Sequence, residues 1–177
     1  IIAYYKFFAN VKDDESVRRI INTPPRGIGK KTVEILETYA HKNDMNLFES
    51  MPHIDQMGFT NRARSAVSRF YKFIQDYQKL LGTVSLEEWA RMMIDGLGYF
   101  NYLKSNDTEE AKQRSANLDE LLNAISDYCS VTEEPTLQGY LEEVALVADI
   151  DNWQDQKNAV SLMTLHSAKG LEFPVVF

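Results

Sequence analysis

Residues 158–177 read NAVSLMTLHSAKGLEFPVVF, two apolar runs separated by a polar turn. The first run, 160–165, is rich in residues that favour strands, and the turn at 166–170 contains His, Ser, Lys and Gly. A second strand-like run follows at 173–177. A strand that leads into a charged, Gly-containing loop is where α/β folds place ligands. We therefore expect a strand–loop–strand element with a binding loop. Because its second strand is so short, we also expect the chain to be a piece of a larger protein.

The rest of the chain has the pattern of successive helices, so the expected fold class is mainly α, with a short C-terminal β segment. Apolar residues follow helical spacing from Ile1 with no N-cap before them, which predicts that residues 1–12 belong to a truncated connecting helix. Residues 149–158 are polar and aperiodic, and we interpret them as a linker. No internal repeat is visible in the sequence. Further helices are predicted at 15–22, 30–42, 61–81 (N-cap Thr60, C′ residue Gly82), from Ser85 to the glycines at 96 and 98, 108–128 and 137–148.

Composition excludes several classes of protein. The chain has 177 residues, of which 44% are hydrophobic and 25% charged, as in an ordinary globular domain. No apolar run reaches the length that a membrane span needs, and no signal peptide opens the chain, so we expect no membrane partner. The single cysteine, Cys129, excludes an internal disulfide and fits a reducing compartment, which predicts a cytoplasmic protein with a packed thiol. The three histidines are too far apart in sequence to indicate a metal site.

The charge distribution is uneven. The formal net charge is −7, yet basic residues concentrate at 18–42 and 62–79, while acidic residues dominate 107–155. A basic face on an acidic protein can still bind DNA, because the field within a Debye length of about 8 Å governs the contact. The alternative is that both regions are ordinary solvated helix faces.

Residues 23–40 read TPPRGIGKKTVEILETYA and resemble a helix-hairpin-helix element, which binds DNA backbone without reading sequence. Gly27 and Gly29 permit a tight turn that leaves backbone N–H groups exposed at the start of the next helix. These donors and the positive end of the helix dipole form an anion site, and the two lysines that follow add charge. Ile28 is expected to anchor the turn in the core.

A nucleotide-binding P-loop is excluded here, because Pro24 occupies the position of its first glycine and Lys31 that of its Ser or Thr. The remaining alternative is that the glycines merely turn the chain between two helices. The residues predicted to bind DNA at this element are Arg26, Gly27, Ile28, Gly29, Lys30, Lys31 and Thr32.

The sequence TLHSAKGLEF at 164–173 resembles motif V of the UvrD/PcrA/Rep-like superfamily-1 DNA helicases. The resemblance implies that Thr164 and His166 lie beside single-stranded DNA. It also implies that Gly170 lies near the nucleotide phosphates and that Glu172 accepts a hydrogen bond from the ATP ribose. Two further blocks, 18–32 and 137–151, resemble the 2B subdomain of these helicases.

This resemblance predicts two parts: residues 1–155 as an all-α 2B-like subdomain, and residues 156–177 as a motif V fragment of a RecA-like 2A domain. The implied function is that of a fragment of an ATP-dependent 3′–5′ DNA helicase. The implied partners are duplex and single-stranded DNA and the 1A, 1B and 2A domains of the same polypeptide. ATP and Mg²⁺ belong to the full-length protein. Because Walker A and B motifs are absent from these 177 residues, we expect no cofactor and no ATP hydrolysis by the fragment alone.

Two other functions stay open at this point. The helical region could be a regulatory module that docks a protein through the acidic residues at 133–143. It could also be a free-standing helix-hairpin-helix DNA-binding protein.

Overall fold

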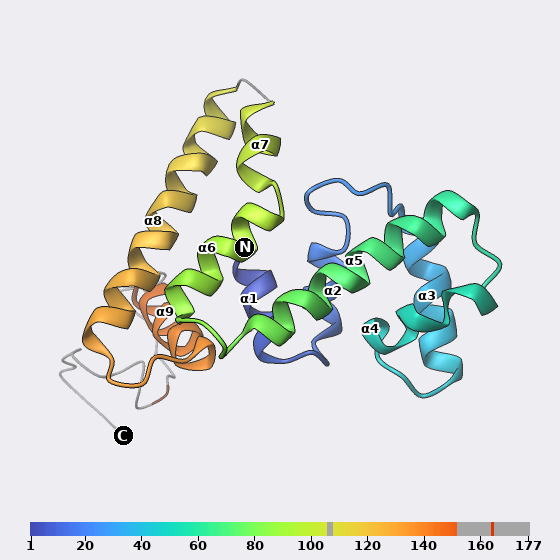
Figure 1. Cartoon of the computed structure of the whole chain (residues 1–177), viewed down its shortest axis with the longest axis horizontal. Helices are drawn as coiled ribbons and strands as arrows, with labels where there is room; N and C mark the ends of the chain where they lie inside the picture. The colour runs from blue at the N-terminus through green and yellow to red at the C-terminus, as the bar shows by residue number, and fades with distance from the viewer. Residues whose placement is uncertain (106–107, 152–163, 165–177) are drawn as a thin grey trace, which may run out of the picture.

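A computed structural model describes residues 1–105, 108–151 and 164, and this part of the chain is mainly helical (Figure 1). It holds nine α-helices and one 3₁₀ helix, with no β-strand among the described residues. The predicted C-terminal β segment lies outside them. The elements are α1 (Ile2–Ala9), α2 (Asp14–Ile20), α3 (Lys30–Lys42), α4 (Leu47–Ser50), η1 (Met51–Gln56), α5 (Asn61–Leu80), α6 (Leu86–Gly96), α7 (Tyr99–Lys104), α8 (Glu109–Val131) and α9 (Leu137–Asp151).

Helix α1 lies at the centre of the fold. Four of its eight residues, Tyr4, Tyr5, Phe7 and Phe8, are at most 2% exposed, whereas Lys6 and Ala9 are exposed. The helix therefore buries its aromatic side chains and presents only a narrow edge to solvent. Helices α2 to α5 lie on one side of α1 and α6 to α9 on the other, and α1 packs directly against α2 and α9 (Figure 1). The two groups of helices therefore share one core.

Trp89 of α6 links this core to the second group of helices. Its side chain is fully buried, its ring meets that of Phe8 edge to face at 5.0 Å between centroids, and Tyr5 lies 5.8 Å away. Its indole Nε1–H donates to the carbonyl oxygen of Tyr77 on α5 at 2.9 Å. A buried tryptophan normally needs such a partner for its N–H. Trp89 thus joins three helices at once.

Local sequence signals placed several helix ends correctly. The predicted helix at 30–42 is confirmed as α3. Thr60 caps α5 by accepting from the Ala63 amide, and Ser85 caps α6 by accepting from the Glu88 amide, as predicted. Gly82, the predicted C′ residue of α5, has φ of +83°.

Other boundaries differ from the predictions. The helix predicted at 15–22 spans Asp14–Ile20, and the helix predicted to end at residue 148 continues to Asp151, which shortens the proposed linker. Helices α4 and α7 and the 3₁₀ helix were not predicted, because four to six residues are too few to show a helical period. No helix of the described residues is long and apolar enough to cross a membrane.

We predict that Trp89→Phe lowers the free energy of unfolding by roughly 2 kcal/mol, because it removes the hydrogen bond to Tyr77 and leaves a void in a close-packed core. Urea denaturation followed by circular dichroism measures this. Met92→Ala on the same helix is the control: Met92 is 41% exposed, so the change should stay within about 0.5 kcal/mol. Equal small effects of both substitutions would contradict the central role of Trp89.

Candidate nucleic-acid interface

The turn between α2 and α3 has the conformation that its two glycines suggest. Gly27 has φ of +78°, a region that L-residues with side chains rarely adopt. Gly29 is extended, with φ −82° and ψ 170°, and forms the N-cap of α3 without a side chain. Both glycines are exposed, and no atom lies within 4 Å of the position that a Cβ on Gly29 would occupy. The start of α3 is therefore open to solvent.

Two side chains, those of Ile28 and Asn22, fix the conformation of the turn. Ile28 is 1% exposed and sits in the core, as predicted. The Asn22 side-chain oxygen accepts from the backbone N–H of Arg26 at 2.8 Å and from that of Ile28 at 3.1 Å. One side-chain acceptor thus satisfies two of the turn's amides and fixes their direction.

Some of the neighbouring amides are closed off within α3 and others are open. The Thr32 and Val33 amides donate to the Gly29 carbonyl at 2.9 and 3.2 Å, which closes the first turn of α3. Thr32 can therefore offer an outside ligand only its hydroxyl. Within the part of the chain that the structure describes, no hydrogen-bond acceptor meets the amides of Gly27, Gly29, Lys30 and Lys31. Four donors thus remain at the positive end of α3.

The basic residues near the turn fall into two groups. Arg18 pairs with Glu37 at 2.5 Å, which ties α2 to α3, and Arg19 pairs with Glu15 at 3.0 Å. Lys30 is almost fully exposed, with 92% of its side chain accessible, and its nearest carboxylate is 3.8 Å away. Lys31 is exposed and has no acidic partner among the described residues. The charge that is free for a ligand therefore lies beside the open amides.

Arg26 faces inward rather than outward. Its guanidinium donates to the carbonyl oxygens of Ile20 and Pro24, at 2.9 and 3.1 Å, and to the Tyr4 hydroxyl at 2.6 Å. These bonds occupy three of its five N–H donors. Arg26 was predicted to bind DNA because of its charge and position, and that role stays a prediction. What the structure adds is that Arg26 connects the turn to α1.

Tyr4 completes this connection. Its hydroxyl lies 2.6 Å from the Thr23 carbonyl oxygen and 3.1 Å from that of Ile20, and it donates to one of them while it accepts from Arg26. Burial raises the pKa of Tyr4 to about 12, and the positive charge of Arg26 only partly opposes this shift. The hydroxyl therefore keeps its proton, and its role as donor, throughout the neutral range.

A second turn repeats the geometry of the first. Gly58 has φ of +66°, Phe59 is 9% exposed and packs into the core, and Thr60 is the extended N-cap of α5. The order of a left-handed glycine, a buried apolar residue and an extended N-cap is that of residues 27–29. The two stretches share only one identical residue in these three positions, so the likeness lies in backbone shape and leaves the expectation of no internal repeat in the sequence standing.

Arg62 is a residue of the interface that the sequence analysis did not assign. It is exposed in the first turn of α5, and its Nε lies 4.0 Å from the position that a Cβ on Gly27 would occupy. It has no acidic partner in the described ranges. Only the spatial meeting of the two turns brings Arg62 to Gly27, and the sequence gives no local signal for that contact.

The remaining predicted site residues belong to the C-terminal segment. His166, Gly170 and Glu172 lie outside the described residues, and so does the predicted fragment at 156–177 apart from Thr164. Thr164 is exposed and in no regular element. Cys129 is half-buried on α8, and burial raises the pKa of its thiol, in keeping with the packed thiol that was predicted. The described residues contain no cluster of three His, Cys, Asp or Glu side chains suited to a metal ion.

The described part is thus a helical domain in which an open helix N-terminus carries unpaired amides and exposed lysines. Comparison with known proteins gives its family: the chain belongs to the UvrD-like helicase C-terminal domain family, whose model matches residues 1–177. It is 38% identical over 179 aligned positions to the ATP-dependent DNA helicase PcrA of Staphylococcus epidermidis, and 37% identical to that of Staphylococcus aureus. Each alignment covers 100% of this chain and 24% of the relative, so the chain spans about a quarter of the curated relatives' length.

We predict that Asn22→Ala exposes the Arg26 and Ile28 amides, because it removes the only acceptor that either amide has among the described residues. Hydrogen exchange at these two amides should become fast, and the free energy of unfolding should fall by about 1 to 2 kcal/mol. Asn22→Asp is the matched control, since its carboxylate still accepts both bonds and should keep exchange slow. Unchanged protection in Asn22→Ala would show that something else holds the turn.

Proposed function

We propose that this chain is the duplex-contacting part of an ATP-dependent 3′–5′ DNA helicase, with residues 1–155 acting as a 2B-like accessory subdomain. The observation that supports this proposal best is the group of four unpaired amides at Gly27 and residues 29–31, beside exposed lysines. Family membership and the similarity to PcrA helicases support the same assignment.

The proposed contact is with the phosphate backbone rather than with bases. Backbone amides at a helix N-terminus bind an anionic oxygen without reading its sequence context. Lys30 and Lys31 add positive charge next to the amides, and Arg62 adds a guanidinium on the other side of Gly27. The protein as a whole carries a net charge of −7, so such binding depends on this local group of cations. The domain would hold duplex DNA weakly and without sequence preference while a motor unwinds it.

The C-terminal segment is proposed to serve that motor. By its resemblance to motif V, Thr164 and His166 would contact single-stranded DNA, and Gly170 and Glu172 would contribute to ATP binding. The 177 residues contain no Walker A sequence, so ATP and Mg²⁺ would be bound together with other domains of the longer polypeptide. In this proposal the fragment positions DNA and does not hydrolyse ATP by itself.

We predict that replacing Lys30 and Lys31 by Ala weakens duplex binding and flattens its salt dependence. Each phosphate contact contributes about 0.9 to the slope of log K against log salt, so two lost contacts should reduce the slope by up to about 1.8. Fluorescence anisotropy with a labelled duplex at several salt concentrations measures this.

The control for this prediction removes the same charge elsewhere. Lys12, in the loop before α2, and Lys79, in the last turn of α5, are both exposed. The double substitution of these two by Ala should leave the slope nearly unchanged. Equal slopes for the Lys30/Lys31 variant and the unaltered protein would remove the proposed phosphate contact.

We predict that Tyr4→Phe weakens duplex binding about five-fold without changing the salt slope. The substitution removes the hydroxyl that links Arg26 to α1, at a cost of about 1 kcal/mol, but it removes no contact with DNA. The same anisotropy titration checks both quantities. Tyr39→Phe on α3 is the control, because its hydroxyl bonds only the exposed Gln56 side chain and its loss should leave affinity unchanged. A flatter slope in Tyr4→Phe would contradict a purely supporting role.

A further inference from the structure

A cavity of about 420 Å³ opens beside the first turn, between the turn, α5 and the end of α6. Its size falls within the range of about 300 to 1,000 Å³ that is typical of pockets for small ligands. Of the turn residues that were predicted to bind DNA, only Arg26 lines it. The residues that matter for its chemistry are Pro25 and Arg26 of the turn, Arg69, Phe70 and Phe73 of α5, and Gly96 of α6.

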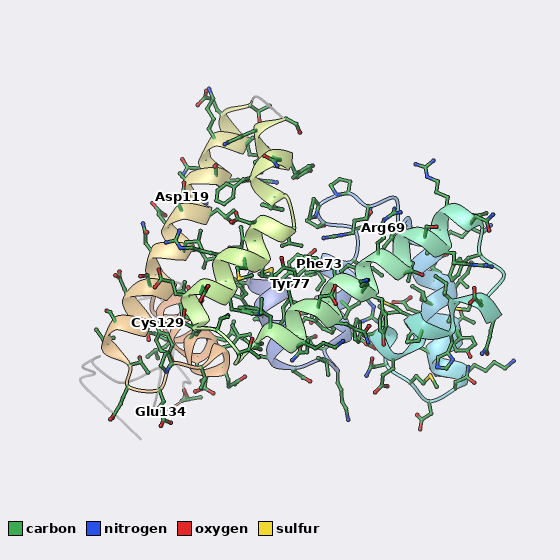
Figure 2. All side chains as sticks on the ribbon, in the orientation of Figure 1. Arg69, Phe73, Tyr77, Asp119, Cys129 and Glu134 are labelled. Carbon is green, nitrogen blue, oxygen red and sulfur yellow. The ribbon has the colours of Figure 1, made fainter. Side chains whose placement is uncertain are left out.

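One wall of the cavity is aromatic and held in place. Arg69, Phe73 and Tyr77 follow each other at four-residue spacing and therefore share one face of α5, along which Figure 2 shows them in succession. Phe73 is half-buried, and its ring packs on that of Tyr77 at 4.6 Å between centroids. The Tyr77 hydroxyl in turn donates to the Met92 carbonyl oxygen at 2.9 Å. The Phe73 ring is thus supported from behind.

Gly96 explains why this wall can form. A Cβ on Gly96 would lie 2.0 Å from the Tyr77 hydroxyl oxygen, so any side chain there would displace the tyrosine. Gly96 has no left-handed backbone conformation, and its place at the end of α6 alone does not require glycine. The close approach of Tyr77 accounts for it.

The cavity also carries positive charge. Arg69 is exposed and has no acidic partner in the described part of the chain, whereas Arg18, Arg19 and Arg64 are all paired with carboxylates. On the opposite side, the Arg26 guanidinium lies over the Phe70 ring, 5.3 Å from its centroid. A ligand in the cavity would therefore meet an aromatic face and a free guanidinium together.

This combination fits an unpaired nucleotide. A nucleobase stacks on an aromatic ring whatever its identity, and a guanidinium binds a phosphate through paired N–H donors. The bases of an intact duplex are stacked inside the helix and cannot enter a side pocket. Arg26 lines the cavity and directly precedes Gly27, so a strand whose phosphate lies at the turn passes next to the cavity.

We propose that this cavity binds one unpaired nucleotide at the end of a duplex, with its base against Phe73 and its phosphate against Arg69. The proposal rests on the proposed function, because it needs DNA to be held at the turn. It adds a preference for a frayed or tailed DNA end over a closed one, which phosphate contacts at the turn alone would not give.

The test compares two DNA ligands on the whole chain by fluorescence anisotropy. One is a blunt hairpin duplex, and the other is the same duplex with a short single-stranded thymidine tail, offered in separate 3′ and 5′ forms. We expect one tailed form to bind about five-fold more tightly than the blunt one. The same tail built from abasic nucleotides should lose most of this gain, because it keeps the phosphates and lacks the base.

Variants then assign the gain to the cavity. Arg69→Gln and Phe73→Leu should each abolish the preference for the tail and leave blunt-duplex affinity unchanged, while Phe73→Tyr, which keeps the ring, should retain it. Arg91→Gln on α6 is the control for charge, since Arg91 is exposed and pairs with Glu87. Circular dichroism checks that each variant folds. If Phe73→Leu does not fold, Arg69→Gln alone decides the test.

The outcomes separate this proposal from the one on which it rests. Equal affinity for blunt and tailed DNA, with the Lys30 and Lys31 dependence intact, would overturn the nucleotide site alone and leave an acidic peptide as the next occupant to test. Absence of any duplex binding would overturn both proposals.

Discussion

Burial of α1 is the constraint on which the rest of the structure depends. Its four aromatic side chains are buried in the one core that both groups of helices share. Trp89 reaches this helix from α6, and Ile20 and Ile28 reach the same core from the side of the turn. Because Tyr4 also carries a hydroxyl, the most buried helix of the fold extends a polar contact to the turn that is proposed to hold DNA. The packing of α1 in the core therefore also determines the geometry of the turn at the surface.

The turn that is proposed to hold DNA combines open amides with nearby cations on a protein of net charge −7. Asn22 binds the amides of Arg26 and Ile28, and the amides of Gly27 and of residues 29–31 are left open. The two bonds to Asn22 hold the backbone in place and so fix the direction of the open amides. Neighbouring cations differ in a similar way, because Arg18 and Arg19 are paired closely with carboxylates, whereas Lys30 lies 3.8 Å from Glu34 and Lys31 has no acidic partner among the described residues. The proposed binding depends on this local arrangement, since charges beyond about 8 Å are largely screened.

The parts of the fold that depend on local chemistry could be predicted from the sequence. The bounds of α3, the caps at Thr60 and Ser85 and the buried Ile28 follow from residues within a few positions of one another. What could not be predicted depends on contacts between distant residues. The sequence gives no sign that Arg26 also donates a hydrogen bond to Tyr4, 22 positions away, and so connects the turn to α1.

Two features of the glycines also depend on the fold rather than on the local sequence. Gly96 was predicted to close its helix, and α6 does end there, but the approach of Tyr77 from α5 is what accounts for the missing side chain. The turns at 27–29 and 58–60 both begin with a glycine of positive φ and end in an extended N-cap, although they share only the glycine in sequence. Both features are visible only in the three-dimensional structure.

The elevated pKa of Tyr4 has a consequence for the whole molecule in alkali. An unfolded phenol ionises near pH 10, whereas the folded protein keeps this proton until about pH 12, so folding loses stability as the pH rises through that interval. A phenolate there would face the carbonyl oxygens of Thr23 and Ile20 and repel both. Burial also raises the pKa of Tyr5 on the same helix, so strong base should destabilise α1 at both tyrosines and weaken its contact with the turn.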